Sequence, residues 1–271
     1  MLPRDGVTDH VYELRGVWKG FEEGPVLRGV DLMLDRGETL GLIGPSGSGK
    51  SLLLKCMIGL RPIDAGVLLF EGRSVPDMSP DEQMRMRQRV GFSFQAGGLF
   101  DSMTVRENLE YSLREQFFAS ITEKELRQRA DWALEAVGLS PSEGDTMPAD
   151  LSGGMQKRVG IARTIITHPE VVLLDEPTQG LDPPNAHRIS DLIVDLRAQL
   201  RLTSIIVAHD LRTVFTVCGR VAYLDGGRIQ EAAPPAELVE SDNPAVRDFV
   251  IGHPPEEELD PRVSQPPEPW T

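Results

Sequence analysis

Hydrophobic and polar positions alternate in the first part of the chain. β-forming residues alternate with polar ones from Val11 to Phe21 and again from Val26 to Leu34, which is the pattern of half-buried strands. Residues 67–70 and 73–75 lie on either side of the turn Glu71-Gly72 and predict a hairpin. We therefore predict an antiparallel sheet in the N-terminal part of the chain.

Further along, apolar residues form short continuous runs. Residues 171–174 and 204–208 are such runs, which are typical of strands buried on both faces of a parallel sheet. Residues 39–43 predict another short strand, and the segments around Asp225-Gly226-Gly227 predict a closing hairpin. These strands predict an α/β core.

Between residue 99 and residue 164 the pattern becomes helical. Thr104 and Glu107 form one capping box, and Thr122 and Glu125 form another, each at the start of a predicted helix. The second helix is expected to end at Gly138, because glycine commonly terminates helices. This region predicts a helical subdomain inserted into the α/β core.

A glycine-rich segment follows the strand predicted at 39–43 and precedes a predicted helix. It fits the pattern G-x-x-x-x-G-K-[ST] of the phosphate-binding P-loop, whose glycines let backbone N–H groups close around an anion. We expect Lys50 to reach the β- and γ-phosphates and Ser51 to hold Mg²⁺. A chance glycine-rich turn is the alternative, which this strand–helix context disfavours. The predicted nucleotide-binding residues are Gly44, Pro45, Ser46, Gly47, Ser48, Gly49, Lys50 and Ser51.

Two carboxylates, Asp175 and Glu176, directly follow the apolar run at 171–174. The carboxyl end of a buried parallel strand is where α/β sheets bind ligands. Because successive strand side chains point to opposite faces, we expect Asp175 to face Mg²⁺ through water and Glu176 to face the γ-phosphate and its attacking water. The alternative is a pair of caps for the next helix, which the nearby P-loop makes less attractive.

Three weaker candidates each have an ordinary structural explanation. Gln95 and His209 each follow a predicted strand. There Gln95 can reach Mg²⁺ or the attacking water, and His209 can contact the γ-phosphate. A glutamine in such a place is more often a cap, and a lone histidine is usually structural. Ser152, Gly153 and Gly154 open a helix, which makes either a second anion site or an ordinary glycine-rich cap.

Three aromatic residues precede the P-loop, and a ring near it can stack on adenine. For Tyr12 and Trp18 we favour a place in or at the edge of the sheet, because rings bury well on half-covered sheets. Phe21 ends its strand at a loop, so we predict that Phe21 is the stacking residue.

The charge of the chain excludes some partners. The 271 residues carry a formal net charge of −14, with a pI near 4.8. An acidic surface argues against binding of the nucleic-acid backbone and against docking on anionic lipid through a basic patch. A nucleotide is still compatible, because its site is local.

Cysteine content and hydropathy suggest where the chain works. Cys56 and Cys218 both lie among apolar residues and predict buried free thiols. No secretory signal and no run of about 18 apolar residues is recognisable. We therefore expect a soluble, cytosolic protein that works at a membrane only through another chain. Residues after Gly252 are proline-rich and acidic, which predicts a disordered tail.

The motifs occur in the order found in ATPase subunits of ABC transporters, a family that the chain resembles over about residues 11–240. The resemblance implies a P-loop NTPase (RecA-like) α/β core, made of residues 1–95 and 166–240, with the antiparallel β subdomain. It further implies that residues 96–165 form the inserted helical subdomain and that residues 241–271 form a C-terminal extension.

The same resemblance implies a homodimer, or a pair of like subunits, arranged head to tail. Each ATP, with Mg²⁺, would lie between the P-loop of one chain and Ser152-Gly153-Gly154 of the other. No nucleic-acid partner is expected, because the chain is acidic. The implied roles are adenine stacking for Phe21, Mg²⁺ and water binding for Gln95, general base for Glu176, γ-phosphate switch for His209, and a place at the dimer seam for Asp182.

A finer resemblance is to the ATPases of Mla/Mce-type lipid transporters. It is carried by residues 94–108, 147–155 and 243–249, and by Met155, where most ABC ATPases have glutamine. It implies phospholipid transport between membranes, a separate integral permease, an Mce-type lipid-binding partner and a place on the cytoplasmic face of the inner membrane. Gln179-Gly180 and the acidic tail depart from the usual pattern.

Two other functions stay open. An ABC importer of polar solutes such as amino acids would share the nucleotide motifs, although Met155 and residues 96–103 argue against it. A soluble ABC ATPase acting on ribosomes or DNA would be expected to carry a second cassette or a long coiled coil. The sequence contains only one P-loop and no long heptad run.

Overall fold

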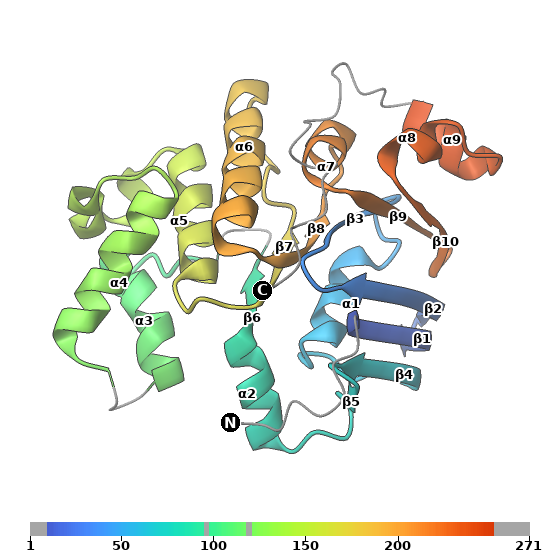
Figure 1. The fold of residues 1–271 in the computed structure, drawn as a ribbon, viewed down its shortest axis with the longest axis horizontal. Helices are drawn as coiled ribbons and strands as arrows, with labels where there is room; N and C mark the ends of the chain where they lie inside the picture. Colours follow the sequence, from blue (N-terminus) through green and yellow to red (C-terminus); the bar gives the residue numbers. More distant parts are fainter. Residues whose placement is uncertain (1–9, 95–97, 118–120, 252–271) are drawn as a thin grey trace, which may run out of the picture. The chain divides into compact units, whose positions relative to one another are not determined.

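The computed structural model describes residues 10–94, 98–117 and 121–251, with the backbone alone at residues 116 and 117. The chain divides into two units (Figure 1). We call residues 1–87 and 203–271 the P-loop unit, and residues 88–202 the helical unit. The predicted Gln95 and the predicted tail after Gly252 lie outside the described residues.

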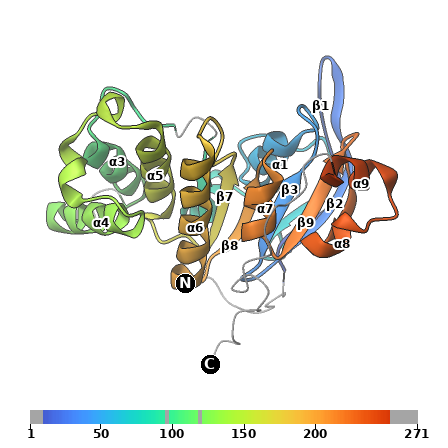
Figure 2. The ribbon, with the colours of Figure 1, turned by 90° about the horizontal axis from the view of Figure 1, so that it is seen from above.

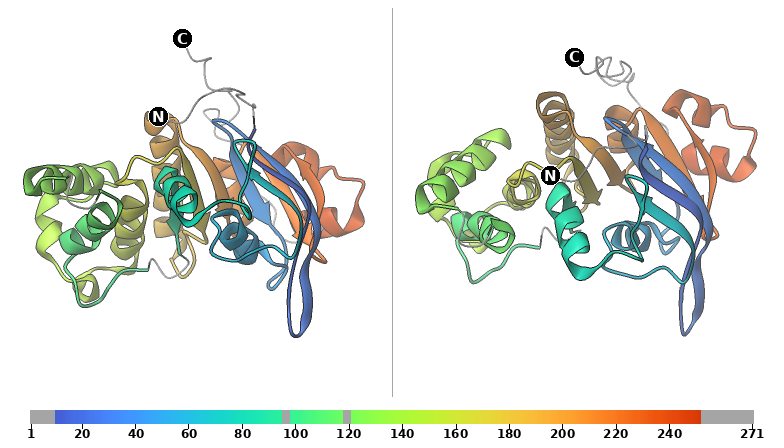
Figure 3. Two further views of the ribbon diagram at one scale, coloured as in Figure 1. Left: turned by 90° about the horizontal axis from the view of Figure 1, so that it is seen from below. Right: turned by 60° about the horizontal axis from the view of Figure 1, so that its bottom comes forward.

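The P-loop unit contains the predicted antiparallel sheet, in the strand order β2-β1-β4-β5. β1 pairs antiparallel with both β2 and β4, and Tyr12 packs in the core with its ring centroid 5.0 Å from that of Phe70. The tip of the long β1–β2 hairpin extends beyond the other strands of this unit (Figures 2 and 3). The strands are β1 His10–Phe21, β2 Gly24–Asp35, β4 Ala65–Phe70 and β5 Arg73–Ser74.

A second group of strands in this unit is built around β3. β3 pairs in parallel with β8 on one side and β9 on the other, and β9 turns through Gly226-Gly227 into the antiparallel β10. β3 and β8 are buried along their whole length, as their apolar runs predict. The strands are β3 Thr39–Ile43, β8 Thr203–Val207, β9 Arg220–Asp225 and β10 Arg228–Ala233.

Helices of the P-loop unit hold these strands in place. α7 packs on β3 so closely that a Cβ at Gly41 would lie 2.3 Å from a Val214 methyl carbon. Both predicted thiols, Cys56 and Cys218, are buried and are not joined in a disulfide, and burial raises the pKa of Cys56 to about 11. The helices are α1 Lys50–Met57, α7 Leu211–Val217, α8 Pro235–Val239 and α9 Pro244–Ile251, and the chain leaves this unit along α2 Pro80–Arg89.

The helical unit combines a parallel strand pair with the predicted helices. β6 pairs with β7, which is buried at all of its positions, and α3, α4 and α5 pack against one another (Figures 1 and 2). The elements are β6 Val90–Ser93, α3 Val105–Phe117, α4 Glu123–Ala136, η2 Pro141–Asp145, η3 Pro148–Asp150, α5 Gly153–Ile165, β7 Val171–Asp175 and α6 Pro183–Leu200.

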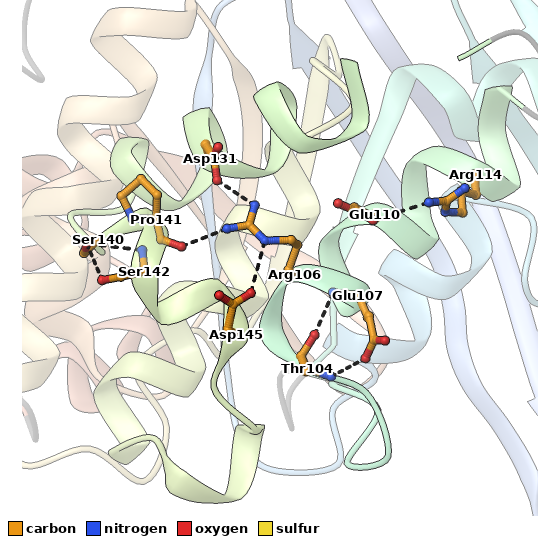
Figure 4. Close-up of polar contacts among 10 residues, drawn as sticks. All are labelled: Thr104, Arg106, Glu107, Glu110, Arg114, Asp131, Ser140, Pro141, Ser142 and Asp145. Atoms are coloured by element: carbon orange, nitrogen blue, oxygen red, sulfur yellow. Dashed lines mark hydrogen bonds and ion pairs between the residues drawn. The ribbon is translucent and has the colours of Figure 1, made fainter. Parts of the chain in front are cut away.

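Hydrogen bonds and ion pairs of polar side chains connect the helices of this unit (Figure 4). Arg106 on α3 donates to Asp131 of α4 at 2.6 Å and to the carbonyl of Pro141 at 2.9 Å, and lies 3.6 Å from Asp145. The Arg106 side chain is only 13% exposed, and the two carboxylates balance its charge, although its Nε has no hydrogen-bond partner among the described residues.

Both predicted capping boxes are confirmed. The N–H of Thr104 donates to Glu107 at 2.7 Å, and the N–H of Glu107 donates to the Thr104 hydroxyl at 3.2 Å (Figure 4). Thr122 and Glu125 form the same reciprocal pair at the start of α4. Gly138 has a φ of 70° after the C-cap residue Val137, as predicted for the end of that helix.

The Thr122 cap gives a local stability prediction. Replacing Thr122 with alanine removes the hydroxyl that accepts the Glu125 N–H, and we expect α4 to lose about 1 kcal/mol of stability. Amide hydrogen exchange along α4 should quicken by about fivefold, whereas Thr122→Ser should keep the wild-type rates. Unchanged protection in Thr122→Ala would contradict a stabilising role for the cap.

The unit boundaries differ from the predicted functional subdivision, because β6, β7 and α6 group with the helices. The predicted division at residues 95/96 and 165/166 was drawn from the positions of the motifs, whereas the two units are compact groups of contacting residues. It therefore stays a prediction.

Candidate functional site

The predicted P-loop lies between β3 and α1, as its pattern requires. Gly49 is the N-cap residue of α1 and has a φ of 105°, a conformation that favours glycine. A Cβ on Gly49 would lie 2.8 Å from a Leu27 methyl carbon and 3.1 Å from one of Val26, so the loop also backs closely onto β2. Conformation and packing together require glycine at this position.

Lys50 begins α1 and is 5% exposed. Its Nζ donates to the carbonyl oxygens of Gly44 at 2.8 Å and Pro45 at 2.9 Å. The ammonium group is thus folded back over the loop that it follows. A cation in this place, at the positive end of α1, attracts an anion.

Ser48 supplies a test of whether the loop fits a phosphate. Its Oγ is buried and has no hydrogen-bond partner among the described residues. A buried hydroxyl without a partner is costly, and a phosphate oxygen in the loop would supply the missing acceptor. The loop residues therefore fit the predicted nucleotide.

Phe21 belongs to the same unit as the P-loop. It ends β1 opposite Gly24 and keeps 52% of its surface exposed, whereas Tyr12 is fully buried. Trp18 is 39% exposed and lies on the sheet beside Gly29. These positions agree with the prediction that the rings of Tyr12 and Trp18 belong to the sheet, and they leave Phe21 available for stacking.

His209 also belongs to the P-loop unit, where it follows β8 and is exposed. The neighbouring Asp210 caps α7, accepting from the N–H of Arg212 at 3.0 Å and from the Thr213 hydroxyl at 2.9 Å. This cap was not predicted, although an aspartate directly before an apolar run is a helix-start signal. The cap fixes the backbone immediately after His209.

Asp175 and Glu176 lie in the helical unit, where they are 3% and 6% exposed. The next helix, α6, has Asp182 as its N-cap residue, so the two carboxylates are not its caps. The prediction that they alternate as strand neighbours was wrong in one respect. Asp175 ends β7, but Glu176 lies beyond the strand with a φ of 53°, and strand alternation does not apply to it.

A lysine that the sequence analysis did not select contacts the same turn. Lys157 on α5 donates to the carbonyl of Glu176 at 3.4 Å, and the N–H of Gln179 donates to that carbonyl at 3.2 Å. Burial lowers the pKa of Lys157, which the charge of Glu176 partly offsets. A half-buried cation therefore supports the unusual backbone of Glu176, and no sequence pattern marks it.

The predicted signature segment opens α5. The Ser152 hydroxyl accepts from the N–H of Met155 at 3.3 Å, which makes Ser152 the helix cap. Gly154 faces the side chain of Asn185, which donates to Asp182 at 2.5 Å. Asp182 therefore lies close to the beginning of α5 within the helical unit. This proximity is expected if both segments belong to the predicted dimer seam.

The predicted site residues are therefore shared between the units. The P-loop, Phe21 and His209 belong to one unit, and Asp175, Glu176, Ser152–Gly154 and Asp182 belong to the other. Within the described residues, no three His, Cys, Asp or Glu side chains gather as a metal cluster. Mg²⁺ needs few protein ligands when phosphates supply the others, and within the P-loop unit the hydroxyl of Ser51 is a suitable oxygen donor.

Residues 27–179 match the family model described as ABC transporter. The chain belongs to the ABC transporter family. It is 38% identical over 242 residues to a methionine import ATP-binding protein MetN of Rhizobium johnstonii, covering 86% of this chain and 66% of that protein. It is 37% identical over 240 residues to a probable ribonucleotide transport ATP-binding protein mkl of Mycobacterium leprae, covering 89% and 68%. The chain thus spans about two thirds of the length of these relatives.

Solved ABC cassettes confirm the predicted fold. The chain aligns with the dimeric structure of the post-hydrolysis state of the ATP-binding cassette MJ0796 bound to ADP and Pi, with a TM-score of 0.76 and 30% identity. The alignment covers 82% of this chain and 98% of that cassette. The chain is therefore an ABC ATPase cassette, of a family that binds ATP with Mg²⁺.

In residues 10–94, 98–117 and 121–251, no helix combines the length and the apolar character that crossing a bilayer requires.

Proposed function

We propose that this chain is the ATP-hydrolysing subunit of an ABC transporter that powers lipid transport between membranes through a separate permease. The P-loop carries the ATP-hydrolysing part of this proposal, in a chain of the ABC family. Its Lys50 is buried, and the hydroxyl of Ser48 has no hydrogen-bond partner in the described part of the chain. The lipid is proposed to be a phospholipid.

In this proposal each site residue has a defined task. Lys50 neutralises charge on the β- and γ-phosphates, and Glu176 takes a proton from the attacking water. Ser51, Asp175 and Gln95 would hold Mg²⁺, which when bound would supply positive charge to offset that of the phosphates. Phe21 stacks on adenine, and His209 senses the γ-phosphate.

The proposed catalytic form is a homodimer. A single chain supplies two anion-binding helix starts, at the P-loop and at Ser152, and twofold symmetry lets two copies share two nucleotides. Ser152, Gly153 and Gly154 of one copy would contact the ATP of the other, with Asp182 at the seam. The dimeric cassette structures of MJ0796 support this arrangement.

The lipid cargo rests on sequence features alone. Met155 and residues 94–108 resemble lipid-transport ATPases, and this resemblance also implies an Mce-type partner and a position on the cytoplasmic face of the inner membrane. Methionine import is the second candidate, favoured by the 38% identity to a methionine import protein. Purification of the native complex distinguishes the two. An Mce-type protein with bound phospholipid supports lipid transport, whereas a solute-binding protein with methionine refutes it.

Lys157 gives a prediction for the hydrolysis step. We expect Lys157→Met to lower kcat by about fivefold with little change in the KM for ATP, because roughly 1 kcal/mol of support for the Glu176 backbone is lost. Steady-state ATPase assays measure both constants. Lys157→Arg keeps a donor and should retain most of the activity. A rise in KM with unchanged kcat would refute this role.

A further inference from the structure

Asp64 holds the end of β1 through three contacts. Its carboxylate accepts from Lys19 Nζ at 2.6 Å and from the N–H of Gly20 at 2.7 Å. Its own N–H donates to the carbonyl of Trp18 at 2.8 Å. These contacts reach the three residues that directly precede Phe21, so the position of that ring depends on Asp64.

The contacts fall where the β1–β2 ladder is irregular. The pairing of β1 with β2 shifts register between Lys19 and Gly20, and such a bulge redirects the side chains that follow it. A Cβ at Gly20 would lie 2.9 Å from the carbonyl oxygen of Gly24, so the hairpin is narrow here. Asp64 accepts the Gly20 N–H at this bulge and thereby fixes the direction in which the chain continues.

Lys19 contacts the aromatic ring itself. Its Nζ lies 5.7 Å from the centroid of the Phe21 ring, within the range of a cation–π contact. The Lys19 side chain is only 12% exposed, whereas Phe21 remains 52% exposed. The ammonium group therefore covers part of the ring, and the exposed part is free to meet a planar base.

The same segments connect the ring to the phosphate site. Asp64 lies in the connection from α1, the helix of the P-loop, to β4. On the other strand of the hairpin, Val26 lies about 7 Å beyond Gly24, and Val26 and Leu27 pack against Gly49 of the P-loop. The ring and the phosphate loop are thus linked through both α1 and β2.

We propose that Asp64 is a positioning residue for base recognition, which acts through Lys19 and the Gly20 N–H to hold the Phe21 ring for stacking on the adenine of bound ATP. This inference rests on the proposed function. The Lys19 hydrogen bond and then the Gly20 N–H hold the pKa of Asp64 below its usual value, so the carboxylate is ionised at neutral pH.

A purely structural ion pair would predict something different. If the Lys19–Asp64 pair only stabilised the fold, its loss would weaken the binding of the phosphates and of the base to the same extent. A positioning role predicts that the affinity falls only for ligands that carry a base. Comparing ATP with inorganic tripolyphosphate separates the two explanations.

The experiment measures the affinity of the full chain for ATP and for inorganic tripolyphosphate by competition against a fluorescent nucleotide, without Mg²⁺ so that no hydrolysis occurs. Phe21→Ala should weaken ATP binding by about tenfold, and Asp64→Ala by about fivefold. The tripolyphosphate affinity should not change in either variant. Asp81→Ala, which removes an exposed carboxylate of the same unit, is the matched control.

The double variant decides whether Asp64 acts through the ring. In the Phe21→Ala background, Asp64→Ala should weaken ATP binding by less than about twofold, because no ring is left to position. Lys19→Arg should retain most of the affinity. Full additivity, equal losses for ATP and tripolyphosphate, or unchanged ATP binding in Asp64→Ala would each overturn the inference. An unchanged affinity in Phe21→Ala would instead remove the stacking role from the proposed function.

Discussion

Glu176→Gln is expected to lower the ATP turnover number by about 10²–10⁴-fold while leaving ATP affinity close to that of the wild type. The amide keeps the size of the side chain but can no longer accept the proton of the attacking water. Glu176 is 6% exposed in its turn after β7. Bulk water therefore has little access to this position and cannot easily take over the role of the base. Phosphate release with saturating ATP measures the effect.

The same variant tests the proposed dimer. With hydrolysis blocked, ATP should hold two chains together, and size-exclusion chromatography with Mg-ATP should show a stable dimer that the wild type lacks. Glu170→Gln is the matched control, because Glu170 lies in the same unit and pairs with Arg89. Normal turnover in Glu176→Gln would show that another group is the base.

Local patterns predicted the elements that hold the site. The buried strand before Asp175 was predictable because a strand covered on both faces has to be continuously apolar. The two capping boxes were predictable because their residues interact within one turn of a helix. The P-loop required only its own spacing and the neighbouring strand and helix. In each case the relevant contacts lie within a few residues of one another.

Contacts between distant segments were not predictable in this way. Asp64 contacts Lys19 across 45 positions of the chain, and Lys157 reaches the Glu176 carbonyl across 19. The left-handed backbone of Glu176 depends on its surroundings as well, because an isolated glutamate avoids it. These residues support the site from outside its motifs, so the motif pattern contains no signal for them.

The affinity of the P-loop for ATP is expected to fall by about 100-fold in Lys50→Ala. The Lys50 ammonium bonds to the carbonyls of Gly44 and Pro45, and ATP would offer it phosphate oxygens in place of these neutral acceptors. A charge-assisted bond to phosphate is stronger than one to a carbonyl. Losing this bond at the buried Lys50 costs about 3 kcal/mol, which corresponds to the expected factor.

A loss of ATP affinity in Lys50→Ala must be separated from unfolding, because Lys50 is 5% exposed and its removal takes one donor from each of the Gly44 and Pro45 carbonyls. Lys55→Ala, on the same helix but outside the P-loop, is the matched control. Inorganic tripolyphosphate should lose as much affinity as ATP, in contrast to the base-specific loss expected for Asp64→Ala. If Lys50→Ala kept wild-type affinity for both ligands and the wild-type melting temperature, the phosphate site would have to lie elsewhere in the chain.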